Sequence, residues 1–191
     1  SQEGSHAGTL HQGRYFERAP MTLEQSIDKI DEIGETQWFN NYPLGWAMAG
    51  NTPCKFYKQN THGGGVRDPL VIHWPQGLPA DAAGTMRHQF HHVSDLTPTI
   101  LDVVGAPLPG TVNGIAQMPL HGTPMTYTFH EADAATRKPV QHFEMLGHRG
   151  IVADGWKAVT LHDARTTLDE DRWELYHLDE DFSETIELAG A

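Results

Sequence analysis

The stretch that decides the fold reads NTPCKFYKQNTHGGGVRDPLVIHWP over residues 51–75. It places a basic cluster, Lys55, Lys58 and Arg67, around three consecutive glycines and ahead of a short apolar run. Elsewhere the chain is acidic, with a formal net charge of −12. A cationic spot on an anionic protein predicts a local anion site rather than a surface for polyanions. The glycines allow the backbone to turn sharply or to approach a ligand closely.

The composition narrows the class of protein. With 191 residues, 38% of them hydrophobic and 20% charged, the chain can bury one substantial core, or one core and a small appended layer. Its acidic balance predicts neither nucleic acid nor an anionic membrane surface as a partner. It has no apolar run of transmembrane length and nothing that resembles a signal peptide, so we expect a soluble protein. The sequence does not distinguish a cytoplasmic from a periplasmic location, and the compartment is unknown. The first residues lack an initiator Met, and we expect the chain to begin inside a longer protein.

The amino-terminal third combines one helix signal with one long loop. The segment Thr22–Ile33 predicts a helix, because Thr22 and Gln25 can form a capping box and Gly34 can end the helix. Residues 35–62 are rich in aromatic side chains, Asn, Pro and Gly, which predicts an irregular loop pinned by aromatic anchors. Such aromatic residues could form a binding wall or could simply pack the loop in place.

The middle of the chain has the pattern of an α/β layer. Leu70–Trp74 is an apolar run between two prolines, which predicts a strand buried on both faces, as in a parallel sheet. A helix is expected to begin between Ser94 and Thr97 and to end at Gly105. The order strand, loop and helix is typical of an α/β layer. We therefore assign residues 1–125 to the end of an α/β core.

The carboxy-terminal part predicts a separate antiparallel sheet. The dipeptide Asp154-Gly155 is a strong hairpin signal. We expect residues 126–191 to form a small subdomain, with its sheet over residues 126–177 and a short helix in the acidic tail, residues 179–188. The expected strands are 127–130, 140–146, 150–153, 156–161 and 173–177.

The chain has 13 histidines, of which His88, His91 and His92 lie close together in the sequence. Such a cluster can be interpreted as a metal site, but neither paired cysteines nor regularly spaced carboxylates complete a ligand set. We therefore interpret these residues as surface or loop histidines and predict no metal ligand in this chain.

The order of features in residues 51–75 resembles the arylsulfatase family of the alkaline-phosphatase-like superfamily. Three further segments are similar to this family in the right order: 92–102, 147–157 with its Trp-Lys pair, and 173–185 with its Trp-Glu-Leu-Tyr run. The resemblance extends from about Asn51 to Leu188. It implies the fold class α/β: the carboxy-terminal part of an alkaline-phosphatase-like α/β sandwich plus a small antiparallel β-sheet subdomain.

The resemblance also implies site residues. In the family, the lysine at the place of Lys58 holds the sulfate group, so Lys58 is the predicted catalytic and substrate-binding residue. His62 could line the same pocket or act structurally at the turn, and Arg67 could contact an anionic substrate or pair with a neighbouring acid. Lys55 is expected to be solvated. Gly63 stands where the family usually has Glu.

Parts of the family machinery are not in this chain. The family makes formylglycine, its nucleophile, from a Cys/Ser-x-Pro-x-Arg motif, and Cys54 does not begin such a motif. Its Ca²⁺ ligands are also expected upstream of this chain. The resemblance therefore implies that this chain is part of a sulfuric ester hydrolase whose substrate is a small-molecule sulfate ester. It also implies that the chain is inactive alone and that its partner is a missing amino-terminal sulfatase region. A phosphodiesterase or phosphonate hydrolase of the same superfamily, and a noncatalytic fragment that docks onto an amino-terminal half, remain alternatives.

Overall fold

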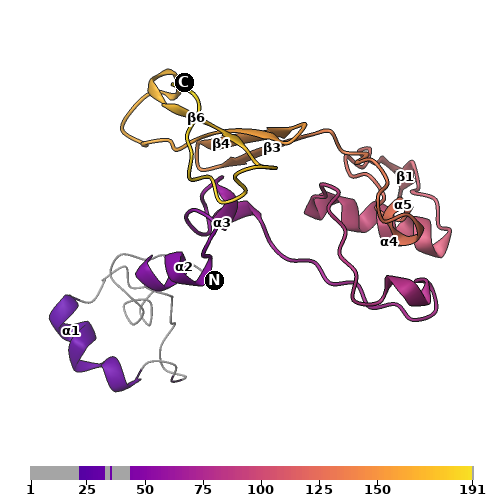
Figure 1. Cartoon of the computed structure of the whole chain (residues 1–191), viewed down its shortest axis with the longest axis horizontal. Coiled ribbons are helices and arrows are strands. Elements are labelled where there is room, and N and C mark those ends of the chain that lie inside the picture. The colour runs from indigo at the N-terminus through magenta and orange to yellow at the C-terminus, as the bar shows by residue number, and fades with distance from the viewer. Residues whose placement is uncertain (1–21, 33–34, 36–43, 191) are drawn as a thin grey trace. The chain divides into compact units, whose positions relative to one another are not determined.

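The computed structural model describes residues 22–32, 35 and 44–190 (Figure 1). The chain forms two compact units, one of residues 1–69 with 142–191 and the other of residues 70–141. The division into residues 1–125 and 126–191 stays a prediction. Gly34 and the aromatic residues Trp38, Phe39 and Tyr42, which entered the sequence interpretation, lie outside the described residues.

The first unit begins with short helices. Helix α1 spans Leu23–Asp28 and is followed by the 3₁₀ turn η2, Ile30–Glu32. The predicted capping box is present, because the amide of Gln25 donates to the Thr22 hydroxyl and the amide of Thr22 donates to the Gln25 side chain. Helix α2, Leu44–Gly50, lies in the segment that we predicted to be a loop, so that prediction is wrong there. Its seven residues make about two turns and bury Ala47 alone, which is too little for an amphipathic pattern to stand out.

The sheet of the first unit has the order β3-β4-β5-β6. Strand β3 spans Val140–Met145, β4 His148–Ala153, β5 Trp156–Thr160 and β6 Trp173–His177, and both the β4/β5 and β5/β6 pairs are antiparallel. Asp154 and Gly155 have φ values of 49° and 80°, as a two-residue hairpin turn requires, which confirms the predicted hairpin. Buried Val152, Val159 and Tyr176 supply the core of this sheet.

Beyond the strands, the described carboxy-terminal part of the first unit consists of turns and irregular segments. The 3₁₀ turn η5, Leu168–Glu170, lies between β5 and β6. The helix predicted in the tail is wrong, since residues 178–190 form turns and irregular backbone. The carboxylate of Asp181 accepts hydrogen bonds from the Ile186 amide and the Ser183 and Thr185 hydroxyls, and such side-chain bonds compete with helix formation.

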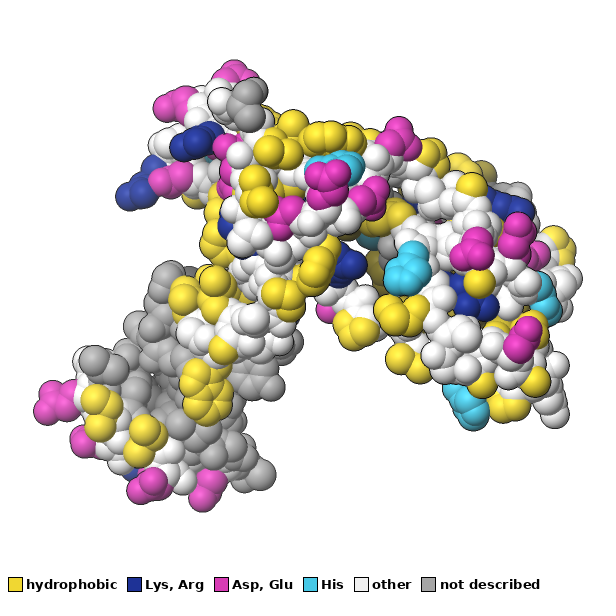
Figure 2. All heavy atoms as spheres, viewed as in Figure 1, with side chains coloured by type: hydrophobic (Ala, Val, Ile, Leu, Met, Phe, Trp, Pro, Cys, Tyr) yellow, Lys and Arg dark blue, Asp and Glu magenta, His cyan; other side chains and the backbone are white. Residues whose placement is uncertain are grey.

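In the second unit, Leu70–Trp74 is not a strand, which corrects the sequence prediction. A strand needs a hydrogen-bonded neighbour, and no strand of the described part of the chain pairs with this segment. Leu70, Val71 and Ile72 are therefore exposed, and Figure 2 shows many such hydrophobic side chains at the surface.

The predicted second helix is confirmed as α4, Leu96–Val104. The 3₁₀ turn η4, Val93–Asp95, leads into it, and Gly105 ends it with φ of 65°. Its buried residues are Pro98 and Thr99, whereas the apolar Ile100 and Val104 are exposed.

Three further elements complete the second unit. The 3₁₀ turn η3 spans Ala80–Ala82, and a small hairpin joins β1, Thr111–Val112, to β2, Ile115–Ala116. Residues 127–130, predicted to be a strand, form helix α5, Tyr127–His130. Local bonds decide this, because the amide and hydroxyl of Thr128 both donate to the carbonyl of Met125. No helix of the described ranges combines the length and apolar character needed to cross a bilayer.

Candidate functional site around the glycine-rich turn

Residues 55–64 form a closed loop, called here the Lys58 loop. The amide of Gly64 donates to the carbonyl of Lys55 at 2.7 Å and so closes its base. The side-chain amide of Asn51 donates to the carbonyls of Phe56 and Gly64, both at 3.0 Å, and ties the two ends of the loop together. The hydroxyl of Thr61 donates to the carbonyl of Arg149 and fastens the loop to β4. Figure 1 shows the adjoining helix α3, Gly63–Val66, beside the sheet.

Two of the three glycines are sterically required. A Cβ atom on Gly64 would lie 2.0 Å from the carbonyl oxygen of Phe56, and one on Gly65 would lie 2.0 Å from the carbonyl oxygen of Asn60. A Cβ atom on Gly63 would instead meet Cys54 Cβ at 3.4 Å and Glu184 Oε1 at 3.5 Å, which are ordinary contacts. Gly64 and Gly65 thus allow the close backbone approach that shapes the loop.

Lys58 lies in the middle of the loop and is exposed. Within the described part of the chain, its ammonium group has neither a hydrogen bond nor an ion pair, so its charge is available to an anion. The contact of Lys58 with sulfate stays a prediction.

His62 lies in the interior and has no exposed surface. Its Nε2 atom is 3.3 Å from Glu174 Oε1, and its ring packs edge-on against Phe56 with 4.7 Å between ring centroids. Its Nδ1 atom has no hydrogen-bond partner among the described residues. Burial lowers the pKa of His62 below its usual value, although Glu174 and Glu184 oppose that shift. The contact of His62 with substrate stays a prediction.

Arg67 follows the last residue of α3, and its amide donates to the carbonyl of Gly63. Its guanidinium group lies over the ring of Phe182, 5.1 Å from the ring centroid. Among the described residues it forms no ion pair, so the expected pairing with a neighbouring acid is not found, and its contact with substrate stays a prediction.

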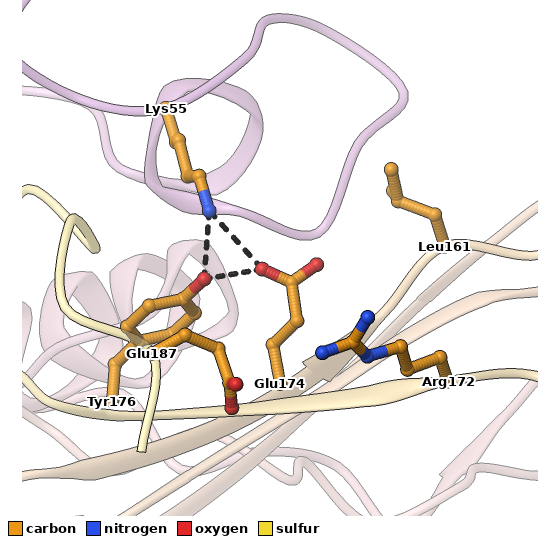
Figure 3. A pocket seen from close by; sticks show the side chains of 6 residues that line it. All are labelled: Lys55, Leu161, Arg172, Glu174, Tyr176 and Glu187. Atoms are coloured by element: carbon orange, nitrogen blue, oxygen red, sulfur yellow. Dashed lines mark hydrogen bonds and ion pairs between the residues drawn. The ribbon is translucent and has the colours of Figure 1, made fainter. Parts of the chain in front are cut away.

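A surface pocket of about 380 Å³ opens beside the base of the Lys58 loop. Lys55 projects into it from the loop, and Glu174 and Tyr176 project from β6 (Figure 3). The ammonium of Lys55 donates to Glu174 Oε2 at 3.1 Å and to the Tyr176 hydroxyl at 2.7 Å, and the Tyr176 hydroxyl donates to Glu174. The expectation that Lys55 is solvated was therefore wrong. Leu161, Arg172 and Glu187 complete the lining.

This network shifts the acidity of its members. Burial, and then the hydrogen bond to Glu174, raise the pKa of Tyr176 above its usual range, so the phenol stays protonated. Burial alone would raise the pKa of Glu174, but hydrogen bonds from Tyr176 and Lys55 outweigh it and hold that pKa below its usual value. Glu174 and Tyr176 are two residues apart on one strand and so share a face, a signal that the sequence analysis did not use.

A buried ion pair also contacts the loop base, through Gly63. The ammonium of Lys157, on β5, is 2.6 Å from Glu184 Oε1, and the two side chains are 2% and 1% exposed. Both oxygens of Glu184 accept the amide of Gly63, at 3.1 and 3.0 Å. Burial lowers the pKa of Lys157, and Glu184 opposes that shift. Sequence reasoning missed this pair, whose members are 27 residues apart.

The histidine cluster has structural partners. His91 Nδ1 lies 3.9 Å from the buried carboxylate of Asp95, and His92 Nδ1 contacts the Ser94 hydroxyl at 2.9 Å. Asp95 also pairs with Lys138 at 3.0 Å. Throughout the described ranges, no three His, Cys, Asp or Glu residues converge in a way that could hold a metal ion. The Ca²⁺ that the resemblance implies therefore does not fit these residues, and it would need ligands from elsewhere in the complete protein.

We expect acid to destabilise the protein in part through His62. Because its folded pKa lies below the unfolded value of about 6.5, the unfolded state binds more protons below that pH. The free energy of unfolding should therefore fall as the pH drops from 7.5 to 5.5. His62→Phe should remove on the order of 1 kcal/mol of that fall, measured by urea unfolding at both pH values. The same replacement at exposed His121 is the control, and an equal effect of the two would contradict the assignment.

Comparison with known proteins identifies the family. Residues 54–191 match the family described as N-sulphoglucosamine sulphohydrolase, C-terminal. The chain belongs to the sulfatase family. The matched range begins at Cys54 and contains the whole Lys58 loop, the sheet and the tail, which confirms the resemblance of the carboxy-terminal portion.

Individual relatives agree with this membership. An uncharacterized sulfatase of Schizosaccharomyces pombe is 27% identical over 164 residues, which cover 85% of this chain and 28% of that protein. N-acetylgalactosamine-6-sulfatase of Sus scrofa is 30% identical over 128 residues, covering 59% of this chain and 24% of that protein. This sulfatase chain thus spans less than a third of the length of either relative.

A solved structure supports the fold. The matched structure is described under the metabolism of multiple glycosaminoglycans by Bacteroides thetaiotaomicron. The TM-score is 0.54 at 17% identity, over 87% of this chain and 31% of that one. The likeness confirms the predicted α/β class with its antiparallel carboxy-terminal sheet.

Proposed function

We propose that the complete protein is a sulfuric ester hydrolase of the arylsulfatase type and that Lys58 binds a sulfate oxygen in its active site. The observation that carries the proposal is the family match over residues 54–191, which includes the Lys58 loop. The exposed ammonium of Lys58, which has no partner among the described residues, supports it further, because such a cation can meet an anionic substrate.

The chemistry explains the need for such a cation. Breaking a sulfate ester bond develops negative charge on oxygen atoms, and fixed positive groups stabilise that charge in the transition state. Lys58 would supply one fixed charge, and the rigid base of its loop would hold it in place without reorganisation. Formylglycine, when present upstream, supplies the nucleophile, and Ca²⁺, when bound, neutralises charge on the sulfate.

The names of the relatives suggest a substrate class. N-sulphoglucosamine sulphohydrolase and N-acetylgalactosamine-6-sulfatase are both named for sulfated amino sugars. We therefore propose sulfated amino sugars as physiological substrates, with aryl sulfates as convenient reporters of the same chemistry.

The experiment is a substrate panel with the complete protein. Turnover of 4-nitrophenyl sulfate, N-sulfoglucosamine and N-acetylgalactosamine 6-sulfate would be compared with turnover of bis(4-nitrophenyl) phosphate. Faster turnover of the sulfated compounds supports the proposal. Preference for the phosphodiester would select the phosphodiesterase or phosphonate hydrolase alternative, and inactivity on all four would select the noncatalytic one.

The isolated 191-residue chain is expected to have no sulfatase activity. It contains no Cys/Ser-x-Pro-x-Arg motif from which the nucleophile could be made, and a hard cation needs several oxygen ligands together. The measurement is 4-nitrophenyl sulfate turnover by the purified chain with added Ca²⁺. Metal-dependent turnover that copurifies with the chain would contradict this expectation.

A further inference from the structure

The carboxy-terminal tail reaches back to the base of the Lys58 loop and contacts it through the side chain of Glu184. Glu184 accepts the amide of Gly63 with both carboxylate oxygens, at 3.1 and 3.0 Å. Gly63 comes directly before Gly64, whose own amide closes the loop on Lys55. The amide that Glu184 holds is therefore adjacent to the hydrogen bond that closes the Lys58 loop.

This contact is built into the interior. Glu184 and Lys157 are each at least 98% buried, and 2.6 Å separates Lys157 Nζ from Glu184 Oε1. A buried ion pair is weak evidence for stability, because removing two charges from water offsets most of their attraction. A better-attested use of such groups is to select one conformation among several. Here, the pair lies beside the conformation in which Gly63 donates to Glu184.

The local backbone gives an independent sign of constraint. Glu184 has φ of 60°, in the left-handed region that residues other than glycine rarely adopt. The tail holds it there, since Asp181 accepts the Ile186 amide and the Leu188 amide donates to Leu175 of β6. A strained residue that the surrounding structure enforces often belongs to a functional region.

Gly63 itself leaves room for the carboxylate. A Cβ atom at this position would lie 3.5 Å from Glu184 Oε1, so the carboxylate sits directly beside the glycine. A longer side chain here would compete for the space that Glu184 occupies. The absence of a side chain at Gly63 and the placement of Glu184 therefore fit each other.

We propose that Glu184, neutralised by Lys157, is a positioning residue that fixes the Lys58 loop through the Gly63 amide and so sets the catalytic placement of Lys58. The inference rests on the proposed function of Lys58. It predicts that loss of the acceptor for the Gly63 amide lowers kcat/KM more than loss of the two charges of the pair. This comparison requires that both charges are removed together, so that neither is left buried without a partner.

Two neutral double variants of the complete protein separate these roles. Lys157→Met with Glu184→Gln removes both charges but keeps an acceptor for the Gly63 amide. Lys157→Met with Glu184→Leu removes both charges and the acceptor. We expect the first to keep kcat/KM within a few-fold of the unaltered protein and the second to lose about 10-fold to 100-fold, since small misplacements of a catalytic group have effects of this size. Glu180→Gln, an exposed carboxylate on the same tail, is the control and should leave kcat/KM unchanged.

A coupling test identifies Lys58 as the route of the effect. In a Lys58→Ala background, the Gln and Leu double variants should have equal kcat/KM, because the group that Glu184 positions is gone. A general structural defect would instead lower kcat/KM by the same factor in both backgrounds, which would overturn the proposal. Equal activity of the Gln and Leu variants in the presence of Lys58 would also overturn it.

Hydrogen exchange gives a readout that is independent of activity. Amide hydrogen exchange of residues 55–64 within the folded protein should be faster in the Leu double variant than in the Gln double variant. If the complete protein proves to have no sulfatase activity, the proposed function falls, and the exchange comparison alone decides whether Glu184 holds the loop. Equal exchange in the two variants would refute that structural role.

Discussion

Lys58→Ala in the complete protein is expected to lower kcat and kcat/KM together by about 100-fold to 1,000-fold, the usual effect of removing one electrostatic donor to the transition state. The ammonium of Lys58 is exposed and has no partner among the described residues, so we expect its charge to act on the sulfate group. An interaction that strengthens as charge develops on the sulfate oxygens affects the chemical step, whereas one of constant strength would change KM alone. Steady-state kinetics with 4-nitrophenyl sulfate, normalised to folded protein, measure the effect.

The choice of control follows from the structure. Lys55 is unsuitable as a matched lysine, because it donates to Glu174 and Tyr176 and its loss would disturb the pocket wall. Gln59→Asn changes the exposed neighbour of Lys58 and keeps a residue that tolerates the left-handed backbone found there, with φ of 75°. It should leave kcat/KM nearly unchanged. Near-normal kinetics of folded Lys58→Ala, or an equal defect in Gln59→Asn, would show that another residue binds the sulfate.

Local signals in the sequence predicted local structure well. The capping box at Thr22, the hairpin at Asp154-Gly155 and the helix end at Gly105 each depend on neighbouring residues alone, and each is confirmed. Strand-forming composition was misleading where local hydrogen bonds decide the conformation. Residues 127–130 have strand-forming composition, yet their side chains and amides find partners a single turn away and form α5.

The site was harder to predict because its geometry is nonlocal. The basic residues around the glycines pointed to the Lys58 loop, but composition could not tell which lysine is paired and which has no partner among the described residues. That distinction depends on Glu174, which is 119 residues from Lys55. The contact between Gly63 and Glu184 spans 121 residues. No periodicity or spacing rule relates positions so far apart, so only the folded chain reveals that Glu174 and Glu184 contact residues at the base of the loop.

The three consecutive glycines at the end of the Lys58 loop and directly after it allow a sharp test of the loop geometry, because these positions differ in the space beside them. Gly65→Ala is expected to lower the free energy of unfolding by about 3 kcal/mol, since its Cβ atom would lie 2.0 Å from the carbonyl oxygen of Asn60 and the backbone must move. Gly63→Ala should cost under about 1 kcal/mol, because its nearest contacts are 3.4 Å or longer.

Urea unfolding of the two variants measures this difference, with Gly50→Ala as the control for the general effect of adding a methyl group in a helix. The Cβ atom of that alanine would have no neighbour within 4 Å, so the change should be neutral or should stabilise by up to about 1 kcal/mol. The order of stability should therefore be Gly50→Ala above Gly63→Ala above Gly65→Ala. If Gly65→Ala were no less stable than Gly63→Ala, the close approach of Gly65 to Asn60 would be wrong, and with it the rigid loop base on which the placement of Lys58 depends.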